Sequence, residues 1–183
     1  MQSGVGKKIV EHAKCITKYI YKHSWVLSLM RENTSGKELV RPAITRFATH
    51  FLTLQCLNSQ QKNLQKMFSS DDWTKSRWAR RQDGKDTKKK VFHNYFWKRS
   101  ANLVKIIEPL VKVLKIVDGE KLAMGYIYEA MDQAKEQIWA AYKDTLTKYG
   151  RIWEIINNRW NNQLHHPIHA AKYFLNPKYH YKD

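Results

Sequence analysis

One stretch of helical periodicity, residues 90–117, constrains the fold of this chain more than any other feature of its sequence. Its apolar residues recur every three, four or seven positions, the spacing that places side chains on one face of an α-helix. They are Phe92, Phe96, Leu103, Ile106, Leu110, Val113 and Val117. Pro109 predicts a kink near Lys105, and Asp118-Gly119 predicts the end of the helix. Because such a stripe must be covered, we expect neighbouring helices to pack around it.

The remaining periodicities predict an all-α protein, an irregular bundle of about six helices. We expect helices at residues 5–31, 42–69, 71–81, 90–117, 122–149 and 152–164, and a short one at 167–175. Polar stretches predict loops at 33–40 and at 82–87. We expect residues 1–177 to form one helical domain and residues 178–183 a flexible tail.

The chain carries 33 Lys and Arg against 16 Asp and Glu, a formal net charge of +17. Such a charge favours a polyanionic partner, although a helical protein with a solvated lysine coat has the same composition. Cys15 and Cys56 are too few for a disulfide framework. No apolar run reaches the ~18 residues of a membrane span, and the N-terminus lacks an apolar signal core. We therefore expect a soluble intracellular chain that does not enter a membrane.

Residues 73–99 form the most basic region, with ten Lys or Arg against Asp83 and Asp86 and with aromatic residues interleaved. Lys and Arg bind phosphates and aromatic rings stack on bases, so the region is a candidate site for DNA or RNA. The candidate contacts are Trp78, Arg80, Arg81, Lys85, Lys88, Lys89, Lys90, Lys98 and Arg99. The alternative is that the rings belong to the core and the charges are solvated. Arg80, Arg81 and residues 88–90 also resemble a split nuclear import signal, which favours the nucleus over the cytoplasm.

No pattern of residues predicts a catalytic or metal site. His165 and His169 have the i, i+4 spacing of two metal ligands on one helix, but Pro167 lies between them and no third ligand follows the known patterns. His23 lies beside the apolar stripe of the first helix and is interpreted as a core or boundary residue. No phosphate-binding glycine loop, nucleophile elbow or paired-carboxylate arrangement occurs. We expect no catalytic residue, no metal and no cofactor.

Several blocks of sequence carry a family resemblance. They are Tyr19-Ile-Tyr-Lys-His-Ser-Trp-Val-Leu, Gly36-Lys-Glu-Leu-Val-Arg-Pro-Ala-Ile-Thr-Arg-Phe-Ala-Thr, Val117-Asp-Gly-Glu-Lys, Met124-Gly-Tyr-Ile-Tyr-Glu-Ala-Met and Arg159-Trp-Asn-Asn-Gln-Leu-His-His-Pro-Ile-His-Ala-Ala-Lys-Tyr-Phe-Leu-Asn-Pro. Together they resemble the central part of plant hAT-superfamily transposase-like proteins, over nearly the whole chain.

The resemblance implies a helical insertion that interrupts an RNase H-like catalytic core. In that family three acidic residues outside the matched region bind divalent metal, so no Asp or Glu of this chain is assigned a catalytic role. Members often have Arg-Trp where this chain has Arg46-Phe47, which implies a DNA contact for Arg46, whereas Phe47 also fits the core stripe of its helix. Other departures, such as Leu122 in place of Pro, suggest a truncated or co-opted fragment.

Two functions remain as hypotheses. The first is a non-catalytic, transposase-derived module that binds a protein of unknown identity or a second copy of itself through its helical faces. The second is binding of DNA or RNA through residues 73–99. The two differ in their salt dependence, because only contacts with phosphates release counterions.

Overall fold

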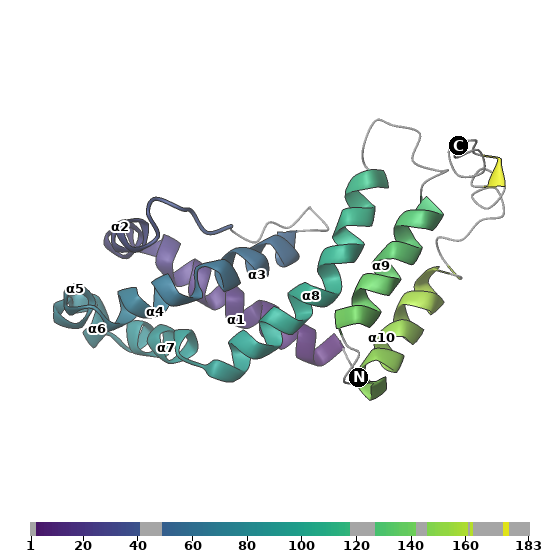
Figure 1. Cartoon of the computed structure of the whole chain (residues 1–183). Helices are drawn as coiled ribbons and strands as arrows, with labels where there is room; N and C mark the ends of the chain where they lie inside the picture. Colours follow the sequence, from purple (N-terminus) through teal and green to yellow (C-terminus); the bar gives the residue numbers. More distant parts are fainter. Residues whose placement is uncertain are drawn as a thin grey trace. The chain divides into compact units, whose positions relative to one another are not determined.

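The computed structural model describes residues 3–40, 49–117, 127–141, 146–160, 162 and 174–175. Within these ranges every regular element is helical and there is no strand, so the all-α class predicted from the sequence is confirmed. Contacts divide the chain into two compact units, Met1–Val104 and Lys105–Asp183, where the sequence predicted one domain. Figure 1 shows the helices in chain order. No helix of the described segments is long and apolar enough to cross a membrane.

The first unit is built from eight helices in its described residues. They are α1 (Ser3–Lys22), α2 (Ser24–Asn33), α3 (Thr49–Ser59), α4 (Gln61–Ser69), α5 (Asp71–Lys75), α6 (Arg77–Arg80), α7 (Gln82–Val91) and the N-terminal part of α8 (Asn94–Val117). The second unit contains the C-terminal part of α8, then α9 (Ile127–Ala141) and α10 (Leu146–Arg159).

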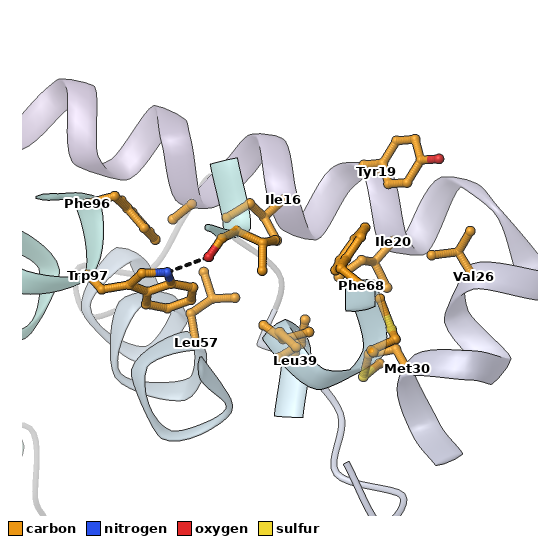
Figure 2. Close-up of a cluster of buried hydrophobic side chains, with 14 of the residues drawn as sticks. Ile16, Tyr19, Ile20, Val26, Met30, Leu39, Leu57, Phe68, Phe96 and Trp97 are labelled. Atoms are coloured by element: carbon orange, nitrogen blue, oxygen red, sulfur yellow. Dashed lines mark hydrogen bonds between the residues drawn. The ribbon is translucent and has the colours of Figure 1, made fainter. Parts of the chain in front are cut away.

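The core of the first unit forms where the apolar faces of α1, α2, α4 and α7 meet (Figure 2). The stripe predicted for the first helix is buried as expected, with Ile16 and Ile20 fully inside. Leu64 and Phe68 of α4 belong to the same cluster and are also fully buried. Each such side chain stabilises the fold by roughly 1.5–3 kcal/mol relative to exposure. This core is what holds α7 in place.

Two of the predicted long helices are broken in the structure. The helix expected at 5–31 is interrupted at His23, whose extended backbone (φ −122°, ψ 109°) separates α1 from α2. The helix expected at 42–69 is interrupted at Gln60, between α3 and α4, and its first residues lie outside the described ranges. Neither break is marked by a Gly or Pro. The helical spacing of apolar residues continues across both, so the sequence predicted one helix in each case.

The long central helix begins at Asn94 rather than at residue 90. Phe92 ends α7 and is 41% exposed, so its predicted place on the buried stripe is wrong. His93 begins the new helix, because its Nδ1 accepts the backbone N–H of Phe96 at 3.2 Å. The indole Nε1 of Trp97 donates to the carbonyl of Val91 at 2.7 Å and fixes the junction of α7 and α8 (Figure 2). Helix α8 then continues through Pro109 to Val117, and the end predicted at Asp118-Gly119 lies outside the described residues.

The loop predicted at 82–87 is wrong, because those residues open α7. Gly84 lies inside this helix, where a Cβ would collide with the backbone carbonyl of Trp78. The helix predicted at 71–81 is two short helices, α5 and α6. Each is capped by a serine, with the Ser70 and Ser76 hydroxyls accepting the backbone N–H groups of Trp73 and Ala79 at 3.2 Å.

The second unit has its own core, formed by α8, α9 and the end of α10. Its buried residues are Val113, Met131, Ala134, Ile138, Ile156 and Trp160. The stripe predicted around Met131 and Ile138 is confirmed, whereas Ile155, also predicted inside, is 46% exposed. Gly150, predicted to end a helix, lies inside α10. The predictions for residues 165–169, the helix at 167–175 apart from its last two residues, and the tail at 178–183 lie outside the described residues.

Candidate functional site

The positive charge of the chain is concentrated in the first unit. Residues 1–104 contain 21 Lys and Arg against 7 Asp and Glu, a net charge of +14. Residues 105–183 contain 12 against 9, a net charge of +3. The first unit is therefore the better candidate for binding an anion.

Helix α7 presents lysines to solvent because its other face is buried. Gly84, Thr87 and Val91 point into the core, at the i, i+3, i+7 spacing of one helical face. Lys85 and Lys89 lie one turn apart and are exposed. With Lys75, Arg77, Arg80 and Arg81, which are also exposed, they form what we call the α5–α7 surface.

Most of these cations have no acidic partner. Within the described residues, Arg77, Arg80, Lys85 and Lys89 make no ion pair. The exceptions are weak or local: Lys75 Nζ lies 3.8 Å from an exposed carboxylate oxygen of Asp71, and Arg81 lies 3.2 Å from Asp83. The surface therefore carries uncompensated charge that an anion can neutralise.

Trp78 is half-buried and packs against the core beside two of these cations. The guanidinium carbons of Arg77 and Arg81 lie 4.8 and 5.2 Å from its ring centroid. The ring of buried His23 lies 4.2 Å from it. Cation–π contacts of this kind hold Arg side chains in place without neutralising their charge.

A buried polar cluster supports α7 from beneath. The hydroxyl of Tyr19 lies below Gly84, and burial raises the pKa of Tyr19 to about 12. Burial lowers the pKa of His23, whose Nε2 lies 3.8 Å from Asp83. The hydrogen bond from Arg81 lowers the pKa of the Asp83 carboxyl. At neutral pH the cluster is therefore a neutral tyrosine and histidine beside a carboxylate paired with Arg81.

The lysines at the end of α7 have a second physical explanation. Residues 88–90 form the last turn of the helix, where positive charge interacts favourably with the helix dipole. Lys88 and Lys90 are half-buried, and the Lys90 carbonyl lies 3.1 Å from Nε2 of His12, whose ring stacks on Phe96. Lys88, Lys89 and Lys90 were all predicted to contact nucleic acid, but only Lys89 is exposed to solvent.

The other predicted contacts lie on α8 or outside the described residues. Lys98 and Arg99 are exposed on α8, and the Arg99 guanidinium lies 4.8 Å from the ring of Tyr95, which is 58% exposed. Arg46 lies outside the described residues.

Sequence reasoning missed a depression beside the α5–α7 surface. It has a volume of about 460 Å³ and is lined by Trp25, Asp72, Lys75, Ser76, Arg77 and Trp78. Trp25 comes from α2 and is 39% exposed. The sequence held one signal for this residue. Val26, Leu29 and Met30 form the buried stripe of the helix, and Trp25 lies outside that stripe.

The described residues contain no group of three His, Cys, Asp or Glu side chains that could hold a metal ion. No protein-family model, no curated protein and no solved structure matches the chain.

Proposed function

We propose that the chain is a non-catalytic module that binds nucleic acid through the α5–α7 surface of its first unit. The observation that carries this proposal is the set of exposed cations on α5 to α7, four of which make no ion pair within the described residues, on a unit of net charge +14. The sequence alone favoured a protein partner over nucleic acid. We now put nucleic acid first, because Arg77 and Arg81 lie near the Trp78 ring and Lys75 lines the same depression as Trp78.

The chemistry of the surface suits phosphates. Lys85 and Lys89 are exposed and make no ion pair within the described residues. They can therefore contact an anion without first breaking a salt bridge. Each phosphate that such a side chain neutralises releases counterions from the nucleic acid, which supplies most of the affinity at low salt. Arg77, held over the Trp78 ring and without an ion pair within the described residues, adds a guanidinium group that can bind phosphate in a bidentate manner.

The resemblance to plant hAT-superfamily transposase-like proteins supports the same proposal. We propose that the module derives from the helical insertion of such a protein, acts without the catalytic acids, and works in the nucleus.

The test uses two charge-reversal variants of the full chain. In the first, Lys85→Glu and Lys89→Glu reverse the outer face of α7. In the matched control, Lys62→Glu and Lys66→Glu reverse an exposed pair with the same i, i+4 spacing on α4. Both variants have the same net charge, so any difference between them reports position.

Binding is measured by fluorescence anisotropy with a labelled oligonucleotide at about 50 and 200 mM salt. We expect the α7 variant to lose at least about tenfold in affinity and to reduce the salt slope by about two, one for each lost phosphate contact. We expect a clearly smaller loss for the α4 variant. Equal losses in the two variants would show that only net charge matters and would contradict the site.

A protein partner remains the second candidate, and the second unit favours it. Large apolar side chains are exposed on its three helices: Leu114 (46%) and Ile116 (44%) on α8, Trp139 (46%) on α9 and Ile155 (46%) on α10. Exposed aliphatic and aromatic side chains on a nearly neutral unit are typical of interfaces. The variant Trp139→Ser/Ile155→Ser should abolish any self-association seen by light scattering and leave nucleic-acid affinity unchanged.

A further inference from the structure

The depression beside the α5–α7 surface contains one partly exposed aromatic ring, that of Trp25, on which no described ring or cation stacks. Trp78 is already occupied, by His23 at 4.2 Å and by the guanidinium groups of Arg77 and Arg81. Trp25 lines the same depression, and among the described residues no ring or cation stacks on it. Because it is 39% exposed in a hollow of about 460 Å³, its indole can accept a flat ligand.

The charged groups of the depression differ from those of a simple anion site. Lys75 and Arg77 supply two cations, but the carboxylate of Asp72 lines the same hollow. A carboxylate repels inorganic phosphate or a sulfated sugar, whereas it accepts hydrogen bonds from an amino group such as N4 of cytosine. A ligand that combines a flat ring, an amino group and a phosphate matches all three features.

We propose that this depression binds an unpaired base of single-stranded DNA or RNA, stacked on Trp25, with its phosphate on Lys75 and Arg77. This inference rests on the proposed function and adds the form of nucleic acid that the surface recognises. In a duplex the faces of the bases are covered by their neighbours and cannot reach Trp25, so the site selects single strands. The α5–α7 surface then binds the phosphates on either side.

The experiment measures affinity for two strands that differ only in their bases. One is a labelled oligo-dC of about 12 nucleotides, a length within the usual range for single-strand sites. The other is the matching abasic oligodeoxyribose phosphate, which has the same charge and no base to stack. We expect the wild-type chain to bind oligo-dC at least about fivefold more tightly than the abasic strand, since stacking of one base contributes roughly fivefold to a hundredfold in affinity. Oligo-rC serves as the RNA arm.

Trp25→Ala should reduce the affinity for oligo-dC to that for the abasic strand, and leave the abasic affinity unchanged. Trp25→Phe keeps a stacking face and should retain most of the difference, which separates stacking from damage to α2. Trp139→Ala removes an equally exposed indole from the second unit and should change neither affinity. Circular dichroism checks that each variant keeps its helices.

The possible failures are distinguishable. If the wild type binds neither strand, the proposed function and this inference both fall. If it binds the two strands equally, or Trp25→Ala lowers both affinities alike, phosphate binding stands and the base site is wrong. If Trp25→Ala weakens the binding of a protein partner but not that of oligo-dC, the depression belongs to a protein interface and the base site is again wrong.

Discussion

The first unit carries a net charge of +14 and the second +3, although both are helical in their described parts and each has its own buried core. The second unit shows that a helical fold of this kind does not require excess lysine. A solvated lysine coat would place charge on both units alike. The concentration of charge on one unit therefore favours a polyanionic partner over a general role in solubility.

The glycines inside α7 and α10 also differ in their surroundings. Gly84 of the first unit lies against the carbonyl of Trp78 and the hydroxyl of Tyr19, so its missing Cβ permits a close approach. Gly150 of the second unit has no atom within 4 Å of where a Cβ would lie. The same residue type is thus required in one helix and dispensable in the other.

The largest effect is expected for Gly84→Ala. The new Cβ cannot fit beside a backbone carbonyl, so α7 must move away from α6, and the free energy of unfolding should fall by about 3 kcal/mol. Urea denaturation followed by circular dichroism measures it. A change below about 0.5 kcal/mol would show that α7 does not pack as described.

A smaller loss is expected for Trp97→Phe. This change removes the 2.7 Å hydrogen bond to the carbonyl of Val91 at the α7–α8 junction, leaving that carbonyl only the Gln65 side chain at 3.3 Å. The free energy of unfolding should fall by about 2 kcal/mol. The control Tyr95→Phe, at an exposed ring, should stay within about 0.5 kcal/mol.

Acidification should weaken the first unit through its buried histidines. Burial lowers the pKa of both His12 and His23, so below the ordinary value of 6.5 the unfolded chain binds more protons than the folded chain. The contribution of the two neutral histidines to the free energy of unfolding is therefore complete above pH 6.5. It decreases as the pH drops below that value, by at most about 1.4 kcal/mol per proton and pH unit.

Burial is the main cause of the lowered pKa of His23; Asp83 opposes it, whereas the charges of Lys22 and Arg81 add to it. Denaturation at pH 7.5 and 5.5 should show a smaller difference for His23→Gln than for the wild type. The exposed His50→Gln serves as the control. If both variants keep the wild-type pH dependence, His23 is not the group that titrates.

The smallest effect, and the opposite sign, is expected for Gly150→Ala. Open space accepts the methyl group, and alanine is the better helix former, so the free energy of unfolding should rise by about 0.5–1 kcal/mol. A loss of stability would mean that α10 packs more tightly at this position than the structure indicates.

The sequence was sufficient for the fold class and for much of the buried faces. The stripes around Ile16, Leu64 and Ile138 could be read because each helix buries one face at a fixed spacing. The breaks at His23, Gln60 and Phe92-His93 could not, since no Gly or Pro marks them and tertiary packing decides them. The loop expected at 82–87 was wrong because Gly84 serves close packing instead of a turn.

The site was only partly predictable, for a physical reason. The basic composition of residues 73–99 is local and can be counted, but which cations are free depends on the buried face of α7. The depression joins Trp25 of α2 to Arg77 and Trp78, about fifty residues away in sequence. Contacts over such separations leave no periodic signal, so Trp25 was found only in the structure, whereas Lys75 and Arg77 lie in the predicted basic region but were not among its named contacts.

The most direct test of the central claim is the salt dependence of nucleic-acid binding by the intact chain. Anisotropy titrations between about 50 and 200 mM salt give the slope of log K against log salt concentration, which counts the phosphates neutralised. If the six side chains of the α5–α7 surface bind phosphates, several such contacts should give a steep slope, roughly −0.7 for each contact with a single strand. A flat slope, or no binding at the lower salt concentration, would contradict the account.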